Sequence, residues 1–175
     1  MQQHFRYQFW ILAAAGVIFF TNLGATALWD EDEPLYAACA REMLQRGDWV
    51  VPTFNGDLFP EKPPLGYWLM IAGYKMFGVT EFAARFWSAL LGVGTALVTY
   101  HLGKRLFRPE VGFWAGLIVA SSIIFTISAR AATLDSALVF VTTAAMLTFV
   151  VGVMAKKGGA GRQPQITPPS PLPTH

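Results

Sequence analysis

Four apolar stretches separated by polar segments constrain the fold of this chain more than any other feature. They cover roughly residues 9–28, 86–102, 111–129 and 134–154. A helix of about 20 residues crosses the hydrocarbon core of a bilayer. Lipid offers no hydrogen-bond partners, so a spanning segment has to satisfy its own backbone as a helix. The sequence therefore predicts an all-α membrane protein with about four transmembrane helices.

The composition agrees with a membrane protein and excludes other classes. Hydrophobic residues make up 54% of the 175 residues and charged residues 14%, whereas soluble domains carry about 25% charged residues. The net charge of +2 provides no strongly basic surface for nucleic acid. Cys39 is the only cysteine, which excludes an internal disulfide and a cysteine-based zinc site.

The basic residues predict the orientation in the membrane. They flank the spans in three groups, which four spans place on one side: Arg6, then Lys104, Arg105 and Arg108, then Lys156, Lys157 and Arg162. Lysine and arginine favour the cytoplasmic side. We therefore expect a multi-pass inner (plasma) membrane protein with both termini cytoplasmic and the first loop, residues 29–81, periplasmic or extracellular. A signal peptide cleaved near Ala25–Ala27 is the alternative, although its apolar stretch is longer than usual.

The first outer loop is expected to contain two short interfacial helices. Asp32 suits the N-cap of a helix over about residues 33–46, which Gly47 would end. Asn55-Gly56 is a turn signal, and a second, aromatic helix is expected over residues 65–77. Residues 1–155 form the predicted membrane domain. Residues 156–175, rich in glycine and proline after residue 158, are expected to be a disordered cytoplasmic tail.

Charged residues gather where the first loop meets the membrane. Four acids, residues 30–33, follow the first apolar stretch, and Glu61-Lys62-Pro63-Pro64 comes about thirty residues later. Ionisable groups at a membrane are costly to desolvate and are usually retained for function.

An ordered series of motifs resembles integral-membrane glycosyltransferases that use polyprenyl-phosphate sugars. This family is of the GT-C type and includes aminoarabinose transferases and protein-O-mannosyltransferase-like enzymes. The matching pieces are Asp32-Glu33, Tyr36, Arg41-Glu42-Met43, Gly47-Asp48-Trp49, Pro52, Asn55-Gly56, Glu61-Lys62-Pro63-Pro64-Leu65, Tyr67-Trp68, Phe82–Phe86 and Ser88-Ala89-Leu90. The likeness covers residues 29–135, and its many ordered matches make it specific.

The resemblance implies roles for four residues. Asp32 matches the catalytic aspartate, Asp135 a second acidic position, and Lys62 the lysine that meets the donor phosphate. Glu61 matches a metal-coordinating glutamate, so the implied cofactor is a divalent metal ion. Each residue also has a structural alternative: helix N-caps for Asp32 and Asp135, and an ion pair between Glu61 and a snorkelling Lys62.

The chain also departs from the family pattern. Leu35 stands where the family commonly has a second phosphate-binding arginine, and no outer-loop histidine is present to complete a metal site. Family enzymes have many more spans, so the chain resembles the N-terminal part of a truncated or split enzyme.

The predicted function is transfer of a sugar from a polyprenyl-phosphate donor to an acceptor on the outer face of the membrane, with lipid and a missing C-terminal half as further partners. One alternative is a non-catalytic fragment or partner subunit that binds a lipid phosphate. Another is a small four-span transporter, which the absence of ionisable residues in the middle of the spans disfavours.

Overall fold

The computed structural model describes residues 2–29 and 32–160 of the chain, and these form helices and one small β-hairpin. The helices are α1 (Gln2–Phe20), α2 (Asp32–Arg46), α3 (Leu65–Phe77), α4 (Glu81–Leu106), α5 (Pro109–Ser121), α6 (Ile123–Arg130) and α7 (Asp135–Ala160). The strands β1 (Thr53–Phe54) and β2 (Asp57–Leu58) pair antiparallel.

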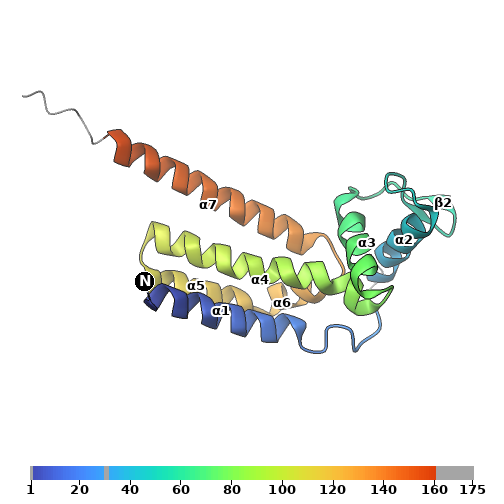
Figure 1. Ribbon diagram of the computed structural model, residues 1–175, viewed down its shortest axis with the longest axis horizontal. Coiled ribbons are helices and arrows are strands. Elements are labelled where there is room, and N and C mark those ends of the chain that lie inside the picture. Colours follow the sequence, from blue (N-terminus) through green and yellow to red (C-terminus); the bar gives the residue numbers. More distant parts are fainter. Residues whose placement is uncertain (1, 30–31, 161–175) are drawn as a thin grey trace, which may run out of the picture.

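The long helices form a bundle, and the first loop forms a separate layer at one end of it. Helices α1, α4 and α5 run side by side, and α7 packs on α4 and diverges from it toward its C-terminal end (Figure 1). Helices α2 and α3 and the hairpin gather at the end of the bundle where α4 and α7 begin (Figure 1). This end carries the candidate site.

Each layer has its own apolar core. In the bundle, side chains of α1, α4, α5 and α6 pack together, including Ile11, Phe19, Val93 and Tyr100. In the loop layer, α2 and α3 pack on the start of α4 through residues such as Met43, Tyr67 and Ile71. The two cores meet along α4, so the first turns of α4 connect the loop layer to the bundle.

The membrane spans differ from the expectation in two places. Among the described residues, α4 and residues 135–155 of α7 are long and apolar enough to cross a membrane. The expected third span, residues 111–129, is broken into α5 and α6, which are bent by 64° at Ser122, so the pair counts as a third span only if both parts belong to one crossing. The break follows from the extended backbone of Ser122, which interrupts the helical hydrogen bonds.

The first apolar stretch also forms less helix than predicted. Helix α1 ends at Phe20, and residues 21–26 form turns and bends instead of continuing to residue 28. Asn22 has a positive φ of 54°, a conformation incompatible with helix. The apolar part of α1 is therefore short, and α1 is not among the described helices that are apolar enough to span.

The predicted helix ends and turn in the first loop agree with the structure, except that α2 begins at Asp32, one residue before the predicted start. The interfacial location of α2 and α3 stays a prediction. Helix α3 has the expected bounds, and α2 ends at Arg46 before Gly47, whose φ of 70° stops a helix. Asn55 and Gly56 both have positive φ and form the two-residue turn of the hairpin. At the other end of the chain, α7 continues to Ala160, past the predicted end of the membrane domain at residue 155. The rest of the predicted tail, residues 161–175, lies outside the described residues.

Candidate functional site

A buried ion pair between Glu33 and Arg85 lies at the centre of the end of the bundle where α4 and α7 begin. The carboxylate of Glu33 lies in the first turn of α2, and the guanidinium of Arg85 lies in the second turn of α4. Arg85 donates from Nε to Oε1 at 3.0 Å and from Nη2 to Oε2 at 2.7 Å. The two residues are only 1% and 3% exposed. Such bidentate geometry fixes both side chains in orientation as well as position.

The ion pair also connects the segments around it. Arg85 donates to the carbonyls of Leu23, Thr26 and Ala27, and so holds the chain between α1 and α2. Glu33 accepts the backbone N–H groups of Trp29 at 3.0 Å and Ala132 at 2.6 Å. The network therefore fixes the starts of α2 and α4 and the loop before α7 relative to one another.

The hydrogen bonds determine the charge state of Glu33. Burial by itself would raise the pKa of Glu33, but the hydrogen bond with Arg85 and those from the Ala132 and Trp29 amides outweigh it and hold the pKa below its ordinary value. Glu33 is therefore ionised at neutral pH, and both members of the pair are charged and satisfied.

Asp32, Tyr36 and Lys62 come together beside this network. Asp32 is the first residue of α2 and is exposed, and Tyr36 follows one turn later, with only 6% of its surface exposed. The ammonium of Lys62 lies 5.8 Å from the centre of the Tyr36 ring. Two of the sequence-predicted site residues thus lie around one tyrosine, and Tyr36 also belongs to the matching motifs.

Electrostatics keep this group in a definite protonation state. A hydrogen bond with Tyr36, followed by the charges of Asp32 and Glu61, raises the pKa of Lys62 above its ordinary value. Burial raises the pKa of Tyr36, so its hydroxyl stays protonated. The Lys62 ammonium donates to the Tyr36 hydroxyl, which in turn donates to the Asp32 carboxylate. An exposed ammonium is a donor suited to a phosphate.

Asp135 reaches the same end from another element. It is the first residue of α7 and is exposed, and it accepts a hydrogen bond from Thr133 Oγ1 at 3.4 Å. Asp135 lies three residues after Ala132, whose amide binds Glu33, and Asp32 directly precedes Glu33. No hydrogen bond or ion pair joins Asp135 to Asp32, Lys62 or Glu61 among the described residues.

The described residues do not fit the implied metal site. Glu61 is exposed, and its charge contributes to the raised pKa of Lys62. Within residues 2–29 and 32–160, no group of three or more His, Cys, Asp and Glu side chains could hold a metal ion. A bound divalent cation normally needs several such ligands, so no step of the chemistry is assigned to a metal ion.

A second carboxylate anchors the hairpin to α2. Glu42 accepts hydrogen bonds from Thr53 Oγ1 at 2.7 Å and from the Asn55 amide at 2.8 Å. These bonds lower the pKa of Glu42, the one from Thr53 most strongly. The matching Glu42 and Asn55-Gly56 motifs are therefore two halves of one structural contact.

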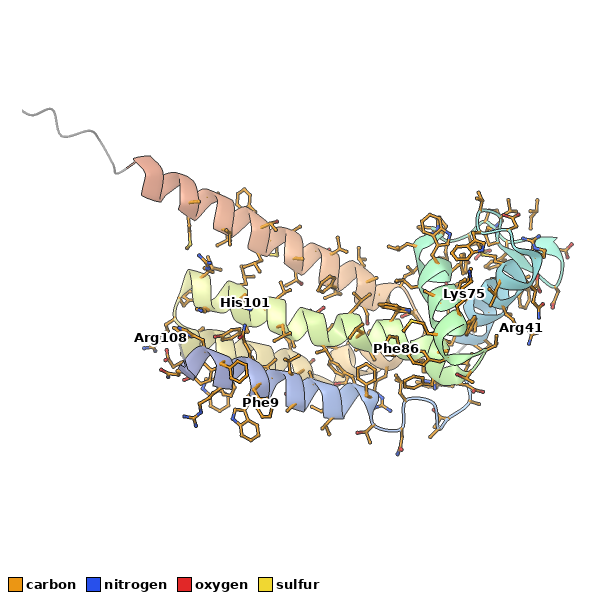
Figure 2. All side chains as sticks on the ribbon, in the orientation of Figure 1. Phe9, Arg41, Lys75, Phe86, His101 and Arg108 are labelled. Carbon is orange, nitrogen blue, oxygen red and sulfur yellow. The ribbon has the colours of Figure 1, made fainter. Side chains whose placement is uncertain are left out.

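Trp49 joins the loop layer to α3. Its carbonyl accepts from Trp68 Nε1 at 2.7 Å, and the Lys75 ammonium lies 4.3 Å from the centre of its indole ring. Figure 2 shows Lys75 and Arg41 at this end of the molecule. Lys75 is thus a lysine of the same layer that already has an aromatic partner.

The role of Arg85 is not predictable from the matching motif that contains it, because its partner lies 52 positions away in the chain. A signal is present in the sequence, however, since Arg85 directly precedes the predicted second span, where a charge requires a partner. The Asp32-Glu33 motif supplies that partner.

The fold and the site together define a helical membrane protein with an acidic, lysine-containing site at one end of its apolar helices. Residues 5–165 match the profile of the dolichyl-phosphate-mannose-protein mannosyltransferase family. The chain belongs to this family, and the resemblance predicted from its motifs is confirmed.

Individual proteins are also similar in sequence to this chain, and two of them are arabinosyl transferases. The chain is 38% identical over 154 residues to an undecaprenyl phosphate-alpha-4-amino-4-deoxy-L-arabinose arabinosyl transferase of Edwardsiella ictaluri, covering 86% of this chain and 28% of that protein. It is 36% identical over 149 residues to the corresponding transferase 2 of Sodalis glossinidius, covering 85% and 27%. An uncharacterized protein of Aquifex aeolicus is 38% identical over 134 residues, covering 76% and 27%.

Solved structures share the fold. Those of ArnT from Cupriavidus metallidurans, in the apo state and bound to undecaprenyl phosphate, superpose with a TM-score of 0.75 at 29% identity. They cover 90% of this chain, which in turn covers 28% and 27% of those chains. The chain thus spans a little over a quarter of the length of its relatives.

Proposed function

We propose that this chain forms the donor-binding part of a membrane glycosyltransferase that takes its sugar from a polyprenyl phosphate. The cluster of Lys62, Tyr36 and Asp32 carries this proposal, because it joins an exposed ammonium to a carboxylate at the end of the apolar helices. The structure of the relative bound to undecaprenyl phosphate supports a lipid phosphate as the ligand.

Each residue of the cluster has a part in the proposed reaction. The Lys62 ammonium binds the phosphate of the donor and stabilises the charge that it gains on leaving. Tyr36 positions Lys62 and Asp32 relative to each other through its hydroxyl. The bond between the anomeric carbon and the phosphate oxygen breaks, and a bond from the acceptor hydroxyl oxygen to that carbon forms. Asp32 accepts the proton of this hydroxyl as general base. Asp135 approaches from α7 and orients the acceptor.

The membrane arrangement is part of the proposal. Helix α1 would cross as a first, short span and the bent pair α5–α6 as the third, which gives four crossings with both termini in the cytoplasm of an inner-membrane protein. Transfer would then occur on the outer face. Because the chain covers about a quarter of its relatives, we expect a further membrane segment to complete the acceptor site.

One specific observation favours a second candidate, a partner subunit that binds the lipid phosphate without catalysing transfer. Among the described residues, no hydrogen bond or ion pair joins Asp135, the second acid of the proposed reaction, to Lys62 or Asp32. Co-expression with a separately encoded C-terminal half separates the two, since restored transfer indicates a split enzyme.

Binding of undecaprenyl phosphate to the purified chain tests the function. Lys62→Ala should weaken binding roughly ten- to a hundredfold, because a charge-assisted hydrogen bond to the phosphate is lost. Lys62→Gln should not restore binding, since the amide carries no charge. Lys75→Ala is the matched control, because Lys75 lies in the same layer but stacks on Trp49, and it should bind as the parent chain does. Equal binding by the parent chain and both Lys62 variants would reject the phosphate role.

A further inference from the structure

A groove at the other end of the bundle has features of a binding site that the proposed transfer reaction does not use. It lies between the first turns of α1 and the start of α5, has a volume of about 490 Å³, and is lined by Gln3, Arg6, Tyr7, Trp10 and Phe113. The transfer cluster is at the opposite end, where α2 and α3 lie (Figure 1).

The wall of the groove is held by side-chain contacts. The rings of Tyr7 and Phe113 stack with their centres 4.6 Å apart, which joins α1 to α5. Gln3 Nε2 donates to the Tyr7 hydroxyl at 2.9 Å. The guanidinium of Arg6, in contrast, is exposed and makes no hydrogen bond or ion pair with the rest of the described chain. Its donors are therefore available to a ligand.

The surroundings of the groove are basic. Lys104 and Arg105 lie in the last turn of α4. Arg108 directly precedes α5 and lies at this end of the bundle, beside the start of α1 (Figure 2). Segments 2–20 and 100–121 contain a single acidic residue, Glu110, which lies in the first turn of α5. Four basic residues against one acid give this end a positive field, which attracts anions.

The groove continues into an apolar face of α1. Trp10 is 56% exposed, and Val17, two helical turns further on the same face, is 67% exposed. Tryptophan favours the headgroup level of a bilayer, so Arg6, one turn before it, lies at the depth of lipid phosphates. A ligand with a phosphate at Arg6 and apolar chains along Trp10 and Val17 matches this order of side chains.

We propose that this groove binds an anionic phospholipid, with the Arg6 guanidinium on the headgroup phosphate and Trp10 and Phe113 against the glycerol and the first carbons of the acyl chains. Arginine binds phosphate in a bidentate manner, and basic pockets between transmembrane helices are typical sites for anionic headgroups. An apolar protein helix would fit less well, because it would bury the charge of Arg6 without a partner.

Native mass spectrometry of the full chain in detergent tests the proposal. The protein is mixed with equal amounts of phosphatidylglycerol and phosphatidylcholine of the same acyl chains, and we expect it to retain phosphatidylglycerol preferentially. Arg6→Gln should lower that retention about fivefold, as expected for one basic contact at a membrane surface. Arg105→Gln is the control, because it removes a positive charge from the same end without changing a residue of the groove, and it should retain nearly the parental amount.

A further variant and two competing ligands test whether the lipid is held in the groove itself. Gln3→Trp fills the groove while leaving Arg6 in place, and it should also lose phosphatidylglycerol, so the test does not depend on the Arg6 variant alone. Inorganic phosphate should not compete with the lipid, whereas binding of undecaprenyl phosphate should depend on Lys62 and not on Arg6. Equal retention of both phospholipids, an equal loss in Arg105→Gln, or displacement by inorganic phosphate would overturn the proposal.

Discussion

Asp32 and Glu33 are neighbours in the chain, yet their surroundings assign them different tasks. Asp32 is exposed at the start of α2, whereas Glu33 is 1% exposed and receives four hydrogen bonds. A carboxylate that already has four donors cannot also bind a substrate. The buried Glu33 therefore fixes the first turn of α2, and the carboxylate of Asp32 next to it stays accessible.

Replacing Glu33 should reveal the contribution of the buried pair. Its lowered pKa means that ionised Glu33 stabilises the fold above the ordinary carboxyl pKa of about 4.3, and that this stabilisation is lost as the pH falls through the lower, folded value. Glu33→Gln leaves Arg85 buried without a counter-charge and should lower the free energy of unfolding by about 3 kcal/mol at pH 7. Thermal unfolding in detergent between pH 7 and pH 3 measures both effects.

The pH dependence of stability provides the control for the role of Glu33. The Glu33→Gln variant should lose less stability than the parent chain as the pH falls from 7 to 3, because it lacks the titrating carboxylate. Glu81→Gln changes an exposed glutamate in the first turn of α4 and should keep the parental slope. Identical slopes for the parent chain and Glu33→Gln would show that Glu33 does not link folding to pH.

Asp32→Asn separates catalysis from helix capping. Asn and Asp cap helices about equally well, so a cap would leave both α2 and the activity intact. A general base requires the carboxylate, and its loss typically lowers the rate by ~10²–10⁴. Sugar transfer is measured with the chain and its completing segment together, and circular dichroism checks the helix. A variant that folds and transfers sugar at the parental rate would assign Asp32 a structural role only.

At the scale of elements, the sequence was sufficient to predict those features that a few adjacent residues determine. Helix α3, the stop at Gly47 and the Asn55-Gly56 turn were predictable, because propensity and positive φ are properties of a few adjacent residues. The end of α1 at Phe20 and the break at Ser122 were not, because hydropathy identifies an apolar stretch without showing where its helix bends. Of the predicted site residues, Asp32 and Lys62 lie around Tyr36, whereas Asp135 makes no hydrogen bond or ion pair with them in the described part of the chain. The central Glu33–Arg85 pair was not predicted, because it depends on tertiary contacts.

Close packing of α3 on α4 should depend on Gly73. A Cβ at this position would overlap the carbonyl oxygen of Ala83, which is backbone and cannot turn away. Gly73→Ala should therefore lower the free energy of unfolding by about 1–3 kcal/mol through overpacking. Gly16→Ala in α1 is the matched control, because a Cβ there has no neighbour within 4 Å. It should be neutral or stabilising by up to about 1 kcal/mol, and equal losses in the two variants would show that overlap with Ala83 is not the cause.

At the scale of the whole molecule, the two ends differ in charge and in proposed task. The end formed by α2, α3 and the starts of α4 and α7 carries the carboxylates around Lys62, and the other end carries Arg6 and the basic turn between α4 and α5. Lysine and arginine are retained on the cytoplasmic side during insertion. We therefore expect the same asymmetry to place the groove at the inner leaflet and the cluster of Lys62, Tyr36 and Asp32 on the outer side.

Cysteine labelling measures that orientation directly. Single cysteines at Asn55, in the hairpin turn, and at Lys157, near the end of α7, are placed in a Cys39→Ala background and exposed to an impermeant maleimide on intact cells. Asn55→Cys should react and Lys157→Cys should react only after permeabilisation, because the basic groups favour the cytoplasm. Burial raises the pKa of Cys39 to about 11, so restoring this cysteine should add little signal. Labelling at position 157 but not at 55 in intact cells would show the opposite orientation. It would place the cluster of Lys62, Tyr36 and Asp32, and with it the proposed transfer, on the cytoplasmic face.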